Sequence, residues 1–146
     1  MKITRGQSQA RRARKTVTFD GLTLNGLVNE NVTLFTLTGR VWVKAMTIFC
    51  TETLAGATAT VSLGTASGVA NLIGATTATT IAANDWWGDT SPAEIGILSL
   101  EVTAPVLLNF VLSESPVIAV ATQNVTDGTL VIDCWYEPIT DNGFLA

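Results

Sequence analysis

The sequence predicts an all-β fold, an antiparallel, jelly-roll-like β-sandwich that follows an extended basic N-terminal arm. Short runs rich in valine and threonine recur after residue 15, separated by glycine, asparagine and aspartate, which is the pattern of short strands joined by turns. No apolar repeat of helical period is longer than the arm, and closely spaced strands without crossover helices pair antiparallel. A chain of 146 residues, 47% of them hydrophobic, can build one core but is too short for two typical domains. We therefore expect an arm at 1–15 and a single sandwich domain at 16–146.

Turn residues bound most of the expected strands. A jelly roll has eight strands, which is close to the number expected here. The expected strands are 16–19, 22–24, 32–38, 40–51, 57–65, 71–74, 95–100, 106–112, 117–121 and 129–136. Residues 76–83 form an edge strand or a loop, and 84–92 form a loop because turn residues concentrate there. The turn at 126–128 predicts a hairpin between the last two strands. The run 40–51 is apolar on both alternating faces, which is typical of a strand packed on the core on one side and on a second layer or subunit on the other.

Charge is distributed unevenly along the chain. The eight lysines and arginines all lie within the first 44 residues, which carry two carboxylates and so sum to +6, whereas the remaining residues carry ten carboxylates and no base and sum to −10. Folded surfaces normally intersperse both signs, so this separation predicts that the arm meets an acidic protein surface. The predicted partner-binding residues are Lys2, Arg5, Arg11, Arg12, Arg14 and Lys15.

The arm has no apolar periodicity and would be disordered on its own. Residues 8–15 contain good helix formers, so a brief helix is one alternative, although a helix this short needs a partner to persist. The arm could also bind nucleic acid through phosphates. The acidic domain and the absence of aromatic residues from 1–15 argue against nucleic acid as the partner.

Composition argues against several classes of chemistry. The chain has no histidine, so a Ser-His-Asp or Cys-His site is excluded and the usual zinc ligand is absent. It also lacks a glycine-rich phosphate loop ending in Lys-Ser or Lys-Thr. We expect a non-enzymatic protein with no cofactor and no metal.

Two carboxylates flank a pair of tryptophans in the expected loop 84–92. Asp85 and Asp89 could act as a glycosidase pair or bind calcium, while Trp86 and Trp87 could stack on a sugar. The dense oxygen-ligand spacing of a dedicated calcium loop is missing. The competing interpretation is structural: one tryptophan ring in the core and the other against a neighbouring subunit.

Cys50 and Cys134 are isolated in apolar, strand-like runs, without the close spacing of a zinc or redox motif. Packing is the expected role of both thiols. A disulfide would require neighbouring strands with about 5.5–6 Å between the two Cα atoms, and it is disfavoured in a reducing cytoplasm.

No stretch of the chain is long and apolar enough for a membrane span. The richest stretch, 105–122, is interrupted by Ser-Glu-Ser-Pro at 113–116, and the cluster of bases at 11–15 occupies the place where a signal peptide needs apolar residues. We expect no membrane partner and no secretion.

Three passages carry a resemblance to a known class of proteins. They are Val61-Ser-Leu-Gly-Thr-Ala-Ser-Gly with Asn71-Leu-Ile, the strand Val106-Leu-Leu-Asn-Phe-Val-Leu, and Val131-Ile-Asp-Cys-Trp-Tyr-Glu-Pro followed by Asp141-Asn-Gly. In these passages the chain resembles the small β-rich structural proteins of tailed bacteriophage virions, of the kind that decorate capsids or form head fibres and neck or tail components. The resemblance implies a sandwich without catalysis, repeated many times on a particle.

Residues and resemblance together predict a capsid decoration or auxiliary head protein, made in the host cytoplasm and located in the virion. Its expected partners are other copies of itself, as a trimer for example, and the major capsid protein or another virion protein. Several weak ion pairs of the arm would act together, repeated over many copies. The alternative is a carbohydrate- or host-binding module of a tail or fibre that uses the Trp86-Trp87 loop.

Overall fold

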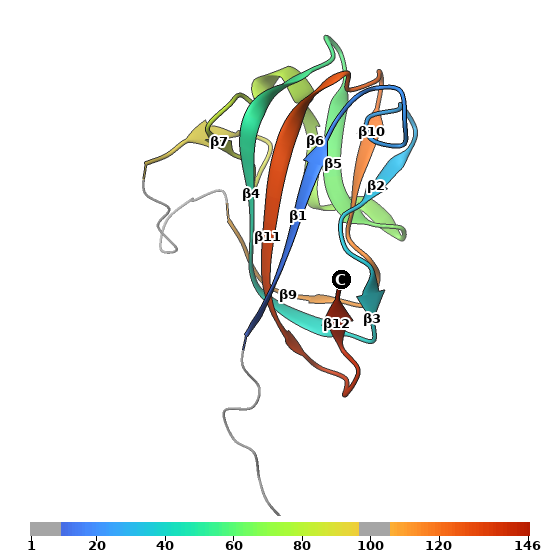
Figure 1. The fold of residues 1–146 in the computed structure, drawn as a ribbon, viewed down its shortest axis with the longest axis vertical. Coiled ribbons are helices and arrows are strands. Elements are labelled where there is room, and N and C mark those ends of the chain that lie inside the picture. The colour runs from blue at the N-terminus through green and yellow to red at the C-terminus, as the bar shows by residue number, and fades with distance from the viewer. Residues whose placement is uncertain (1–9, 97–105) are drawn as a thin grey trace, which may run out of the picture.

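The computed structural model describes residues 10–96 and 106–146 as antiparallel β-sheets (Figure 1), and the expectation of an all-β, antiparallel fold is confirmed. The large sheet has the order β1 (Arg11–Thr18), β11 (Asp127–Pro138), β4 (Val41–Ala55), β7 (Asp85–Trp86) and β8 (Ala93–Glu94), and β9 (Leu107–Leu112) also pairs with β4. The second sheet has the order β2 (Asn31–Thr33), β10 (Val117–Ala121), β5 (Thr60–Thr65) and β6 (Gly68–Thr77). A small third sheet pairs β12 (Phe144–Leu145) with β3 (Leu37–Thr38), and one 3₁₀ turn, η1 (Ala78–Thr80), follows β6.

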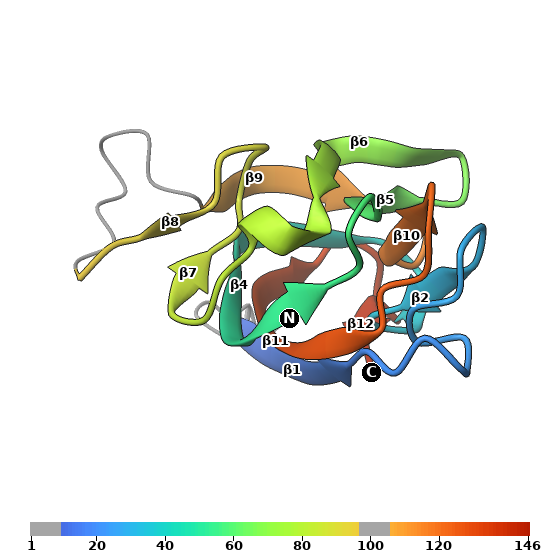
Figure 2. The ribbon, with the colours of Figure 1, turned by 90° about the horizontal axis from the view of Figure 1, so that it is seen from above.

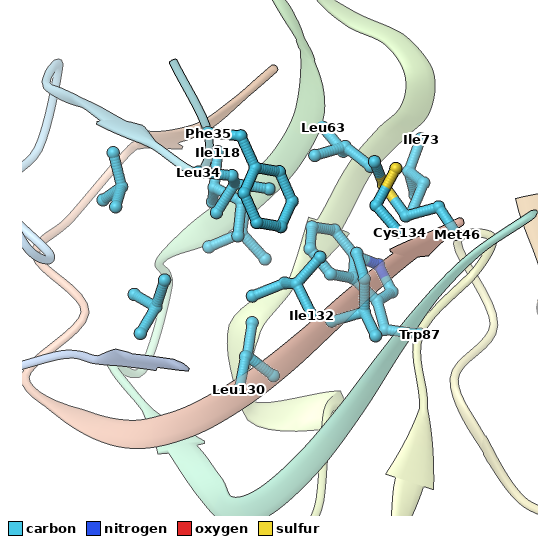
Figure 3. Close-up of a cluster of buried hydrophobic side chains, with 14 of the residues drawn as sticks. Leu34, Phe35, Met46, Leu63, Ile73, Trp87, Ile118, Leu130, Ile132 and Cys134 are labelled. Carbon is cyan, nitrogen blue, oxygen red and sulfur yellow. The ribbon is translucent and has the colours of Figure 1, made fainter. Parts of the chain in front are cut away.

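The core lies between the two main sheets, with β1 and β11 on one side and β5 and β6 on the other (Figure 2). Alternate residues of β11, namely Leu130, Ile132 and Cys134, point into it, and the second sheet contributes Leu63 and Ile118 (Figure 3). This period-2 burial is what a strand with one covered face requires. It fixes the pairing register, since a slip by one residue would turn the apolar set to solvent.

A β-bulge at Lys44 explains why neither face of 40–51 reads as polar in the sequence. Val43 pairs with Tyr136 and Ala45 with Trp135, so Lys44 is the extra residue opposite a register shift. The buried set consequently changes phase, from Val41 and Val43 before the bulge to Met46, Ile48 and Cys50 after it. A bulge places two residues opposite one and so moves the side chains beyond it to the other face.

The N-terminal boundary of the sandwich differs from the expectation. All eight residues of β1 pair with β11, from Arg11 opposite Tyr136 to Thr18 opposite Thr129. Arg11 to Lys15 therefore belong to the sheet and are not part of a separate arm, and a helix over 8–15 is wrong for residues 11–15. Residues 1–9 lie outside the described residues, so Lys2 and Arg5 have no structural placement.

The expected strand 22–24 is a turn. The Asp20 carboxylate accepts hydrogen bonds from the backbone N–H of Leu22 and of Thr23, at 2.9 and 3.0 Å, and from the Thr23 hydroxyl. These bonds hold the pKa of Asp20 below its usual value. An aspartate side chain that bonds to its own following backbone offers the chain an alternative to strand pairing.

The expected hairpin around 126–128 is also wrong. β10 pairs with β2 and β5 in the second sheet, whereas β11 pairs with β1 and β4 in the large one, so the connection crosses between the sheets. Two other segments differ more locally: the expected strand 32–38 is divided into β2 and β3, and the loop 84–92 contains the short strand β7. Of the strand expected at 95–100, residues 97–100 lie outside the described residues.

Candidate partner-binding surface

The basic strand β1 forms one edge of the large sheet, beside β11 in Figure 1. Lysine and arginine have no strong preference for strands, so pairing with the apolar β11 decides the conformation here. Ala13 and Val17 are buried against the core, while Arg12 and Arg14 alternate with them and are exposed. The sheet thus divides the four basic residues of β1 between its two faces.

Arg14 forms an ion pair within the protomer, with Asp133 of the neighbouring strand. Its Nε and Nη2 donate to the two carboxylate oxygens of Asp133, each at 2.8 Å, and this hydrogen-bonded pairing raises the pKa of Arg14. Arg12 Nε lies 3.8 Å from the same carboxylate. A planar fork on a carboxylate is the strongest common ion-pair geometry, so Arg14 is the base in β1 with the least freedom to bind a partner.

Arg11 and Lys15 make no ion pair within residues 10–96 and 106–146. Lys15 lines a cavity of about 240 Å³ between β1 and β2, together with apolar side chains that include Val17, Leu24 and Val32. Both strands are the last of their sheets, so this cavity lies on an open side of the sandwich. Arg11 and Lys15 are the bases of β1 with charge left to offer.

The two tryptophans of the 84–92 loop have different environments. Trp87 is fully buried and its indole N–H donates to the Thr76 hydroxyl at 3.0 Å, so it cannot contact a glycan or a partner in this structure. Trp86 is half-buried, and its ring centroid lies 4.7 Å from that of Phe49. One ring in the core and one at the surface is what the structural interpretation predicts. A two-tryptophan sugar platform is therefore not formed.

Asp85 and Asp89 each accept a hydrogen bond from a backbone N–H close by in the chain. Asp85 is buried and accepts a hydrogen bond of 2.9 Å from the backbone N–H of Ala82, whereas exposed Asp89 accepts one of 2.6 Å from Ser91. Within the described ranges, no three carboxylate or cysteine side chains are placed to hold a metal ion. Each carboxylate serves the local turn instead.

The cysteines are separate, buried thiols. Cys50 pairs in register with Leu130 and Cys134 with Met46, so the two are not cross-strand partners, and both are free. Burial raises the pKa of Cys50 to about 11 and that of Cys134 to about 12. A thiol protonated this strongly at neutral pH is a poor nucleophile, which leaves packing as their role.

The outer face of the large sheet carries an apolar surface that was not among the sites predicted from the sequence. Trp42 pairs with Val111 of β9, and Ala45 lies between Trp135 of β11 and Leu108 of β9. Trp42 is 38%, Leu108 40% and Val111 56% exposed. The Lys44 amino group lies 3.6 Å from the Trp42 ring centroid and 3.9 Å from a Glu137 carboxylate oxygen. The sequence signal for this surface was the run 40–51, which is apolar on both faces of the strand. Contiguous exposed apolar area of this kind marks interaction surfaces.

The fold of the chain is similar to that of a chain in a solved capsid structure. A chain of the cyanophage Pam1 capsid asymmetric unit matches it with a TM-score of 0.58 and 19% sequence identity, over 94% of this chain and 91% of that one. At this identity the likeness establishes a shared fold. No family model matches the chain, and no curated protein matches it. Within the described residues, the structure contains no helix long and apolar enough to span a membrane.

Proposed function

We propose that this chain is a non-enzymatic structural protein of a virion, an auxiliary head protein that decorates the capsid. The observation that carries the proposal is the structural likeness to a chain of a phage capsid asymmetric unit, which extends over nearly the whole length of both chains. A decoration protein needs a stable domain and surfaces that bind neighbouring virion proteins, and it does not need catalytic residues. Such surfaces are the exposed apolar face and the two bases of β1, Arg11 and Lys15, that make no ion pair with any described residue.

We further propose that the connectivity is a jelly roll. In that fold, eight strands numbered along the chain form sheets of order 1-8-3-6 and 2-7-4-5. Counting β1, β2, β4, β5, β6, β9, β10 and β11 as the eight strands gives β1-β11-β4-β9 and β2-β10-β5-β6, which match the strand pairings. Jelly rolls occur widely in viral capsids, so the topology supports the same role.

The attachment has two components in this proposal. Trp42, Leu108 and Val111 supply apolar contact between copies, since large exposed apolar side chains gain free energy when a neighbour covers them. Arg11 and Lys15 supply attraction to an acidic protein surface. Each exposed ion pair contributes about 0–1 kcal/mol, so repetition over many copies is needed for firm attachment.

A glycan-binding module is not favoured, because only Trp86 of the two tryptophans is accessible. Binding of the full chain to a panel of bacterial surface glycans, compared with a Trp86→Ala variant, checks this alternative. Glycan binding that depends on Trp86 would favour a tail or fibre role over decoration.

Particles of the phage that encodes the chain test the proposal directly. Mass spectrometry of purified particles should find the chain in many copies, and cryo-electron microscopy should place its sandwich on the outside of the head. Absence from purified particles would overturn the proposal. Deletion of residues 2–9, which leaves β1 intact, then measures what Lys2 and Arg5 add to incorporation, and the Arg11→Glu/Lys15→Glu variant measures what β1 adds.

A further inference from the structure

The two edges of the large sheet carry opposite charge. β1 forms one edge, with Arg11 and Lys15 in no ion pair among the described residues, and the β7–β8 hairpin forms the other together with the uncharged strand β9. Figure 1 shows β7 and β1 on opposite sides of the β4–β11 pair. The hairpin carries Asp85 in β7, exposed Asp89 in the turn and exposed Glu94 in β8. The chain has no lysine or arginine after Lys44 to balance them nearby in sequence.

The hairpin contains a like-charge pair that lacks a cation. Asp85 and Glu94 are register partners, directly opposite one another across β7 and β8. Directly opposed like charges destabilise an antiparallel pair, and no base forms an ion pair with either carboxylate within residues 10–96 and 106–146. A bound metal ion is not the evident solution, because the described residues contain no three-ligand group placed to hold one. A positive group from outside the protomer would relieve the repulsion.

We propose that the basic edge strand β1 of one copy docks on the acidic β7–β8 hairpin of the next copy. The inference deepens the proposed function, on which it rests, by naming the partner of β1 as a second copy of this chain. Arg11 and Lys15 of one protomer are placed toward Asp89 and Glu94 of its neighbour. Such a contact joins two different surfaces, so repetition with a closing rotation gives a ring.

Charge also selects against the symmetric alternative. Two β1 edges brought together would place Arg11, Arg12 and Lys15 against the same bases of the other copy, and like-charge contacts oppose association. Edge strands that carry lysine and arginine resist pairing with themselves for this reason. The same charges permit pairing with an acidic edge, and the attraction should weaken as salt shortens the screening length, about 10 Å at 0.1 M ionic strength.

Charge reversal tests the contact in the purified full chain, by sedimentation velocity at low salt. The Arg11→Glu/Lys15→Glu variant and the Asp89→Arg/Glu94→Arg variant should each associate about tenfold or more weakly than the parent. The variant with all four changes should regain association, because both edges exchange sign. Glu30→Arg/Asp141→Arg is the matched control, since both side chains are exposed and lie in neither edge. Circular dichroism and thermal unfolding establish that each variant is folded.

Three results would overturn the inference: a parent chain that stays monomeric at low salt, single-edge variants that associate as the parent does, or a four-change variant that fails to regain association while folded. None of these bears on whether the chain occurs in particles. A chain found in virions that fails the charge-reversal test leaves the proposed function standing and removes this contact. Loss of the proposed function, by absence from particles, leaves a positive charge-reversal result intact.

Discussion

Arg14 donates two hydrogen bonds of 2.8 Å to the carboxylate of Asp133, a residue 119 positions later in the sequence. Asp133 is only 8% exposed, so the pair ties the edge strand β1 to the centre of the large sheet. The densest basic cluster of the chain therefore has one member with an internal role. Arg11 and Lys15 of the same strand make no ion pair in the part of the chain that the structure describes.

Replacing Arg14 by alanine should lower the thermal unfolding temperature more than replacing Arg11 by alanine. Loss of Arg14 leaves the carboxylate of Asp133 with only the 3.8 Å contact from Arg12, and an unpaired carboxylate in a poorly solvated position is unfavourable. Differential scanning calorimetry of the two variants makes the comparison. Equal unfolding temperatures would show that the Arg14 pair contributes no more than an exposed charge.

The sequence predicted the strands whose local pattern agrees with their burial. The expected strand 117–121 has the bounds of β10, and 129–136 lies within β11, because both are short, mostly apolar runs that follow turn residues, at 113–116 and 126–128. It did not predict β1 from residue 11, since Arg-Arg-Ala-Arg-Lys favours no strand by itself and the deciding partner is β11. The strand expected at 22–24 was wrong because the alternation of Leu22 and Leu24 does not show the hydrogen bonds that the Asp20 carboxylate accepts from the backbone of Leu22 and Thr23.

The candidate site was predictable in composition and not in arrangement. The sequence identifies the basic residues but not their environments. Arg14 binds Asp133, Lys15 lines a cavity and Arg11 lies in the edge strand, because β1 pairs with a strand more than a hundred residues away in sequence. The apolar outer face was hidden by the bulge at Lys44, which interrupts the alternation that would have separated core from surface.

Replacing Trp87 by phenylalanine should lower the free energy of unfolding by about 1–3 kcal/mol, because the buried Thr76 hydroxyl loses its donor. The shorter ring also leaves a space in a close-packed core. Trp86→Phe is the matched control, and its change should be within about 0.5 kcal/mol, since Trp86 is half-exposed. Urea denaturation followed by circular dichroism measures both. A Trp86 effect as large as that of Trp87 would contradict the assigned environments.

Raising the pH above about 9 should destabilise the fold through its two buried thiols. Burial raises the pKa of Cys50 to about 11 and that of Cys134 to about 12 in the folded chain, whereas an unfolded thiol has a pKa of about 8.5. Between these values the folded state binds more protons than the unfolded state, so the free energy of unfolding falls as pH rises. Urea denaturation at a series of pH values measures the slope, and the Cys50→Ala/Cys134→Ala variant should show a smaller one.

Thiol labelling gives an independent check of the same burial. An aromatic disulfide reagent at pH 8 should modify neither cysteine in the folded chain and both in denaturant, because the two side chains are fully buried and held protonated. Rapid labelling of the folded chain, or fewer than two thiols in denaturant, would contradict two free and buried cysteines.

Placing a charge on the outer face of the large sheet should weaken association between copies without unfolding the protomer. Val111 is 56% exposed and lies beside Trp42 on this face, so the Val111→Glu variant should keep its fold. Any contact that covers the face would then bury an unpaired carboxylate, which is unfavourable.

Val69→Glu on β6 is the matched control, because Val69 is also an exposed valine, at 38%, on the other sheet. Sedimentation velocity of the two variants should show weaker association only for Val111→Glu, by about tenfold or more. Equal association of both variants with that of the parent chain would mean that no copy covers this face, and the apolar component of the proposed assembly would have to lie elsewhere.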